Sequence, residues 1–158
     1  MAVSKTNAMR ILDTNLIEYI ITSYGLEDGE IDGVSVAQKL GREAGIVYKT
    51  LVVQGSSKEH YVFLVPVEAQ LDLKKAAKTV KEKKIEMTAV KDIQKLTGYV
   101  RGGCSPIGMK KLFPTFIDKR SKSLETLIVS GGSIGTQIEL QLENLVKVTK
   151  AHFADLLR

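Results

Sequence analysis

The sequence has very little cysteine and histidine, and this scarcity removes several kinds of site. Cys104 is the only cysteine among 158 residues, so an intramolecular disulfide and a zinc site built from several thiolates are both excluded. The two histidines, His60 and His152, are far apart in the sequence and belong to no metal-binding motif. We therefore expect neither redox chemistry nor a metal or other cofactor.

Long apolar runs are also missing. No stretch approaches the roughly 18 apolar residues of a membrane-spanning helix. The amino-terminal sequence MAVSKTNAMRILD lacks the uninterrupted apolar core of a signal peptide. We therefore expect a cytoplasmic protein with no membrane partner.

Neither sign of charge is concentrated in blocks. The 23 lysines and arginines are interspersed with 18 acidic residues, which gives a net charge of +5 and a pI near 9.2. The composition, 44% hydrophobic and 26% charged, is typical of a folded protein, and the length favours one domain over residues 1–158. This balance permits binding to nucleic acid without demonstrating it, because a solvated basic surface has the same composition.

Helical and strand patterns alternate irregularly along the chain. Helices are expected from the Thr6 cap to residue 12 and at 36–40, 71–80, 90–96 and 142–157; strands are expected at 17–21, 46–53, 61–67, 115–118, 126–129 and 137–140. Several strands follow one another too closely for the helical crossovers of an all-parallel sheet. The patterns predict an α/β fold with a mixed, barrel-like sheet surrounded by helices.

A lysine shares a strand face with aliphatic side chains. The period of two places Lys49 on the same face as Val47, Leu51 and Val53. Such a lysine can discourage aggregation at a sheet edge, or cover apolar surface with its stem while the ammonium reaches water. It can also hold a positive charge at a cleft, where it would orient a carboxylate, carbonyl or phosphate.

Two glycine-rich segments, residues 102–108 and 130–135, could bring backbone N–H groups close to a ligand. Neither matches a P-loop or a dinucleotide fingerprint, and a structural turn explains each equally well. Cys104 lies in the first segment, but a catalytic thiol needs a nearby base. The histidines lie in an expected hairpin turn and the expected terminal helix, where surface positions are typical. The sequence thus contains no clear nucleophile, base or metal set, which favours a binding module or a reaction whose substrate supplies the reactive group.

Five stretches, taken together in their order, resemble the YbaK/EbsC family of transfer RNA editing proteins, which are related to the editing domain of bacterial prolyl-tRNA synthetases. The resemblance covers nearly the whole chain and is carried by residues 47–51, 70–78, 98–111, 114–118 and 130–132. It implies a barrel-like α/β fold and the deacylation of Cys-tRNA(Pro) in partnership with prolyl-tRNA synthetase. In the implied reaction, the thiol of the substrate cysteine attacks its own ester carbonyl, which would explain the missing base.

The resemblance also implies roles for individual residues. Lys49 corresponds to the family's pocket lysine, and Gly102, Gly103 and Ser105 occupy the substrate loop. The other residues expected to line the pocket are Tyr24, Pro106, Gly108, Ser130, Gly131 and Gly132. Cys104 stands where the family accepts an aliphatic residue, which indicates a packing role.

The chain also departs from the family pattern. Many relatives have a basic pair after the Ser-Gly-Gly motif and an aspartate shortly beyond it, whereas this chain has Ser133, Ile134 and Gln137. These differences concern contacts to transfer RNA and the preferred amino acid, for which alanine or another small residue is the alternative. Five lysines could contact the acceptor stem or form solvated faces: Lys74, Lys75, Lys78, Lys110 and Lys111.

Overall fold

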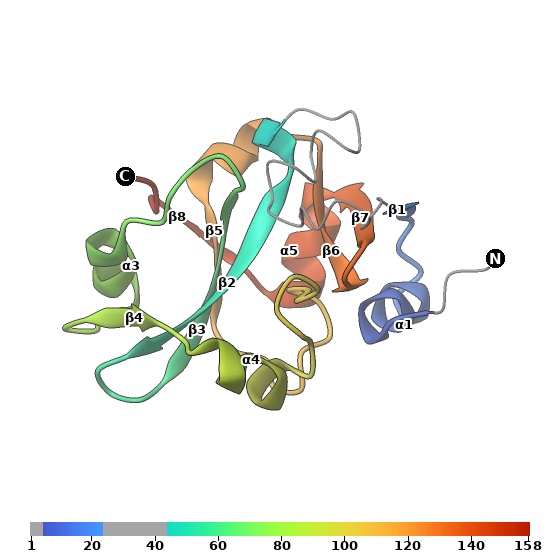
Figure 1. Cartoon of the computed structure of the whole chain (residues 1–158). Helices are drawn as coiled ribbons and strands as arrows, with labels where there is room; N and C mark the ends of the chain where they lie inside the picture. Colours follow the sequence, from blue (N-terminus) through green and yellow to red (C-terminus); the bar gives the residue numbers. More distant parts are fainter. Residues whose placement is uncertain (1–4, 24–43) are drawn as a thin grey trace.

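The computed structural model describes residues 5–23 and 44–158, which form two β-sheets with helices packed against them (Figure 1). The strands are β1 (Ile20–Ser23), β2 (Tyr48–Gly55), β3 (His60–Pro66), β4 (Ile85–Met87), β5 (Thr115–Asp118), β6 (Thr126–Ser133), β7 (Thr136–Gln141) and β8 (His152–Ala154). The helices are α1 (Asn7–Thr14), α3 (Leu73–Val80), α4 (Val90–Thr97) and α5 (Leu142–Thr149), with 3-10 turns η1 (Ala44–Ile46) and η2 (Lys119–Ser123). The helix expected at 36–40 lies outside the described residues.

The larger sheet has five strands in the order β4-β2-β3-β5-β8, and the smaller has three in the order β1-β7-β6. Antiparallel pairs join β4, β2 and β3, whereas β3, β5 and β8 are parallel, so the expected mixed sheet is confirmed. The two sheets meet at one parallel bridge between Val47 and Ile128. The expected barrel-like closure is not complete, because this single residue pair replaces a continuous ladder.

Apolar side chains pack on both faces of β2. Tyr48 and Val52 join a cluster that includes residues of α1, α5 and the three-stranded sheet. Val53 points to the opposite face, into a second cluster under α3. The period of two expected for this strand is thus confirmed, because neighbouring side chains enter different cores. Within the described ranges, none of the helices has the length and apolar character that a membrane crossing requires.

The carboxyl-terminal segment differs from the expectation of one helix over 142–157. Helix α5 ends at Thr149, Lys150 adopts a left-handed conformation with φ 57°, and β8 then pairs with β5. The buried carboxylate of Asp118 accepts a hydrogen bond from the Leu156 N–H at 3.1 Å and fixes the end of the chain. The spacing of apolar residues in this segment fits a helix or a strand, and pairing with the distant strand β5 favours the strand.

The second glycine-rich segment is also more regular than expected. Residues 130–133 belong to β6 instead of a turn, and a register irregularity between Ser130 and Ser133 accommodates the two glycines. Only the two residues between β6 and β7 form the turn itself. The expected hairpin of β2 and β3 is confirmed, as are helices α1, α3 and α4. The short strand β4 was not expected.

Candidate functional site

The strand β2 presents Lys49 at the junction of the two sheets. Lys49 pairs with Val65 on β3, and Val47, on the same face of β2, packs against Ile128 of β6. Strand β4 pairs with β2 only at Val53–Gly55, so Lys49 has β3 on one side and lies beyond the end of β4 on the other. Its side chain is half-buried, and this burial lowers the pKa of the ammonium. No acidic residue in the described part of the chain forms an ion pair with it.

Ser130 lies on β6, close to the bridge that joins the two sheets. An isolated parallel bridge joins Val47 to Ile128, and these residues stand two positions before Lys49 and Ser130 in the sequence. The Ser130 hydroxyl oxygen accepts a hydrogen bond from the Gly132 N–H at 3.3 Å. Two predicted pocket residues, 81 positions apart in the sequence, are thus each two positions from the bridge between the sheets.

The first glycine-rich loop packs directly against the turn between β6 and β7. A Cβ atom on Gly103 would lie 2.8 Å from the Ile134 backbone nitrogen and 2.9 Å from the Ser133 carbonyl carbon. Gly102, its neighbour, is exposed. The two glycine-rich segments are therefore in direct contact at Gly103.

The rest of the loop is held by internal hydrogen bonds. Ser105 is fully buried, and its hydroxyl oxygen accepts from the Ile107 N–H at 3.2 Å. The buried Tyr99 hydroxyl donates to the Ile107 carbonyl at 2.6 Å, and burial raises the pKa of this tyrosine to about 12. Pro106 is buried, and Gly108 has φ 82°, which favours glycine. In this arrangement Ser105, Pro106 and Gly108 shape the loop.

Residues at the start of helix α1 bind both glycine-rich segments. The sequence indicated the helix cap but not these contacts. Thr6 caps α1 by accepting from the Met9 N–H at 3.3 Å, and its hydroxyl donates to the Gly131 carbonyl at 2.5 Å. Asn7 donates from its side-chain amide to the Gly108 carbonyl at 2.7 Å. Two adjacent residues therefore connect α1 to the loop and to β6.

Comparison with known proteins identifies the family. The model of the aminoacyl-tRNA editing domain matches residues 32–148, most of the chain. The chain belongs to this family. It is 42% identical over 152 residues, 96% of this chain and 93% of the other, to EbsC of Enterococcus faecalis, whose description gives a candidate Cys-tRNA(Pro)/Cys-tRNA(Cys) deacylase.

Solved structures share the fold of this editing domain. A crystal structure described as a candidate trans-editing enzyme for prolyl tRNA synthetase has a TM-score of 0.83 at 25% identity, with 99% of each chain covered. A hypothetical protein of known structure has a TM-score of 0.87 at 18% identity, with 97% of this chain and all of the other covered (100%). The second likeness supports the fold alone.

The lysines suggested for transfer RNA contact lie on different parts of the editing domain. Lys75 donates to the Leu157 carbonyl at 2.7 Å and pairs with Asp155 at 3.2 Å, so it ties α3 to the chain end. Lys74 and Lys78 are exposed on α3, which packs on the second core. The exposed Lys110 and Lys111 follow the glycine-rich loop, whose Ile107 packs in the first core. The loop lysines therefore lie nearer the predicted pocket in sequence and in packing. Tyr24 lies outside the described residues.

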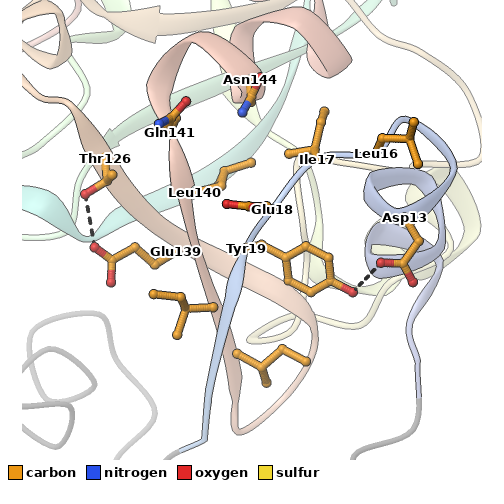
Figure 2. Close-up of a pocket in the computed structure, with 12 residues that line it drawn as sticks. Asp13, Leu16, Ile17, Glu18, Tyr19, Thr126, Glu139, Leu140, Gln141 and Asn144 are labelled. Carbon is orange, nitrogen blue, oxygen red and sulfur yellow. Dashed lines mark hydrogen bonds between the residues drawn. The ribbon is translucent and has the colours of Figure 1, made fainter.

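A separate pocket opens between the start of β1, the end of β7 and helix α5 (Figure 2). Its lining includes the acidic residues Asp13, Glu18 and Glu139 beside apolar side chains. Asp13 accepts from the Tyr19 hydroxyl at 2.9 Å, and Glu139 accepts from the Thr126 hydroxyl at 3.0 Å. Acidic groups repel the phosphates of RNA, so this pocket does not suit the substrate backbone.

Cys104 is poorly placed to act as a nucleophile. The half-buried side chain packs against the first core, and burial raises the pKa of its thiol to about 11. His60 begins β3, with its ring centroid 5.9 Å from that of Phe113. His152 is exposed on β8. The predictions that these histidines lie in a turn and in a helix are therefore wrong. The described residues contain no cluster of side chains that could hold a metal ion.

Replacing Thr6 with alanine is expected to loosen the pocket. The variant loses the helix cap and the bond to Gly131, which should lower the free energy of unfolding by about 1–2 kcal/mol. The matched control Thr6→Ser keeps both hydrogen bonds. Urea denaturation and deacylation rates of the two variants test this role, and equal values for both would contradict it.

Replacing Cys104 with alanine is expected to leave deacylation within about twofold of the wild-type rate, because a thiol with a raised pKa carries little thiolate near neutral pH. The lost sulfur contacts should lower the melting temperature slightly. Single-turnover deacylation measures the rate. A folded but inactive variant would restore Cys104 as the nucleophile.

Proposed function

We propose that this chain is a trans-editing deacylase that releases cysteine from Cys-tRNA(Pro). The observation that carries the proposal is the half-buried Lys49 ammonium, which has no acidic partner among the described residues and stands two residues beyond the bridge that joins the sheets. The matched family and the description of EbsC support the substrate class. The whole chain would act as one editing unit.

The cysteine of the substrate supplies the nucleophile in this proposal. Its sulfur forms a bond to the ester carbonyl carbon, the bond from that carbon to the ribose oxygen breaks, and the thiol proton ends on the departing ribose hydroxyl. The product is a cyclic thioester of cysteine; water then adds to its carbonyl carbon, the carbon–sulfur bond breaks, and free cysteine results. A nucleophile within the substrate gains from proximity, so the protein needs no catalytic base. Cys104 does not compete, because burial keeps its thiol protonated.

Lys49 and the glycine-rich loop would stabilise the developing charge. The ammonium attracts the carbonyl oxygen as it becomes negative, and its half-buried position weakens competition from water. The backbone N–H of the exposed Gly102 would bind the same oxygen, whereas the N–H of Gly103 donates to the Val100 carbonyl at 2.9 Å and holds the loop in shape. Shape and one positive charge then account for the chemistry.

Prolyl-tRNA synthetase is the proposed partner, because it supplies the mischarged transfer RNA. The structural likeness to a protein described as a candidate trans-editing enzyme for this synthetase supports the association. The substrate is formed during translation, which places the proposed activity in the cytoplasm.

A panel of mischarged transfer RNAs tests the function. Purified protein should deacylate Cys-tRNA(Pro) faster than Ala-tRNA(Pro) or Ser-tRNA(Pro) by roughly 100-fold or more, because only cysteine carries the internal thiol. Equal rates would contradict thiol assistance and favour a deacylase that uses water. Tight, salt-sensitive binding of the RNA without loss of the amino acid would instead show a binding module.

A further inference from the structure

Leu16, in the turn between α1 and β1, is an unusual residue for its position. It has φ 58°, a left-handed conformation that glycine or asparagine adopts more readily than a leucine. Its side chain is 92% exposed and belongs to neither of the two large cores. The turn is closed by a backbone bond, from the Leu16 N–H to the Asp13 carbonyl at 3.1 Å, which many other residue types could form. The fold therefore gives no reason for a leucine at this position.

Leu16 belongs to an exposed apolar patch that continues into β1. Ile20 is 64% exposed and Ile21 is 41% exposed, and both line the pocket of Figure 2 together with Leu16. Among the described strands, β1 lies at the edge of the smaller sheet. Single apolar side chains are ordinary on a protein surface, but several that line one pocket on an edge strand are typical of an interaction site.

The charge and shape of this pocket indicate what it binds. The described residues that line it include Asp13, Glu18 and Glu139 but no lysine or arginine. Asp13 pairs with Lys5, whereas the exposed Glu18 forms no ion pair in the described part of the chain. Negative charge disfavours RNA and anionic lipid and attracts basic side chains. Because most of the Leu16 surface faces solvent, a small ligand inside the pocket would leave it uncovered, whereas a protein segment would cover it.

The pocket lies on the same face of the smaller sheet as Ser130. Alternate residues of a strand share a face, so Thr126, which lines the pocket, points to the same side of β6 as Ser130. The two residues are four positions apart, or about 13 Å along the strand. A protein that covers Leu16 would therefore stand near the predicted aminoacyl pocket without filling it.

We propose that the pocket between β1, β7 and α5 is a protein-docking site, which binds a segment of prolyl-tRNA synthetase that carries lysine or arginine beside apolar side chains. The inference rests on the proposed function, in which the synthetase supplies the substrate. Leu16 and Ile20 make the apolar contact, and Glu18 attracts the basic residues. The mischarged acceptor end, on leaving the synthetase, then has only a short distance to cross to the face that carries Ser130.

The test measures the binding of purified prolyl-tRNA synthetase to the full chain by calorimetry, and separately the deacylation of Cys-tRNA(Pro) without the synthetase. Leu16→Asn removes the apolar side chain and suits the left-handed conformation. Glu18→Lys reverses the charge of the pocket. The matched controls, Met87→Asn and Glu86→Lys, make the same two kinds of change at exposed positions of β4 in the larger sheet.

Leu16→Asn and Glu18→Lys should each raise the Kd for the synthetase by about tenfold or more, whereas both controls should stay within about twofold of the wild type. Added salt should weaken binding of the wild type more than that of Glu18→Lys, because salt screens the charge attraction. Leu16→Asn should melt at or above the wild-type temperature, since the fold does not need the leucine. Deacylation without the synthetase should remain within about twofold in every variant.

Wild-type affinity in both pocket variants, or no binding of the synthetase to the wild type, would overturn the inference. A wild-type dimer in sedimentation that Leu16→Asn dissociates would also overturn it, because the pocket would then bind a second copy of this chain. A wild-type chain that is inactive on every mischarged transfer RNA would instead overturn the proposed function. Binding is measured without the reaction, so the two failures are distinguishable.

Discussion

Replacing Lys49 with alanine is expected to lower kcat/KM for Cys-tRNA(Pro) by about 100-fold or more, the typical effect of removing one group that stabilises an oxyanion. The ammonium is half-buried and forms no ion pair with an acidic residue in the described part of the chain. Folding should survive, because burial disfavours the charged form of Lys49 and the loss of that charge removes a cost.

The matched variants separate charge from packing. Lys49→Met retains most of the aliphatic stem and should be as inactive as Lys49→Ala, with a melting temperature at or above that of the wild type. Lys49→Arg keeps the charge with a larger, planar head group and should recover only part of the rate. Deacylation rates and thermal unfolding, measured for each variant, separate the effect of the charge from that of packing. Full activity in Lys49→Met would show that the lysine has no role in the mechanism.

The local periodicity was enough to predict how Lys49 is presented. Alternation along residues 47–53 depends on strand geometry alone, and the structure confirms it through the two cores on opposite faces of β2. The same holds for α3 and α4, since amphipathic spacing and Gly98, which adopts a left-handed conformation at the end of α4, are properties of neighbouring residues. These features require no knowledge of distant contacts.

Other features depend on contacts between distant segments, which one sequence does not specify. The Thr6 hydroxyl reaches the carbonyl of Gly131, 125 residues away, and its capping role alone gives no indication of that partner. Strand β8 forms because β5 offers it an edge, although its spacing also fits a helix. The pairing of Thr22 with Gln137, and of Gln137 with Ser130, depends on the register of three strands. Gln137 and Gln141 are the same residue type on one strand, but Gln137 is buried and Gln141 is exposed.

Replacing Gly103 with alanine is expected to force apart the first glycine-rich loop and the turn between β6 and β7. The new Cβ would meet backbone atoms of Ser133 and Ile134 at 2.8–2.9 Å, and no flexible side chain is available to move aside. The loop and the turn must separate, which should cost about 1–3 kcal/mol of stability. Because the predicted pocket is built from both segments, deacylation should fall by at least tenfold, since small displacements of a reacting group are costly.

Gly45 provides the control for this substitution. Among the described residues, an added Cβ there would meet one atom, the Glu68 carboxylate oxygen, at an ordinary 3.4 Å, so Gly45→Ala should fold and react like the wild type. Thermal unfolding reports the strain in Gly103→Ala, and single-turnover kinetics report the displaced loop. If Gly103→Ala unfolds at a lower temperature yet keeps the wild-type rate, the contact between the two glycine-rich segments stabilises the fold without forming the pocket. A loss of rate that exceeds the loss of folded protein would instead place the substrate where these two segments meet.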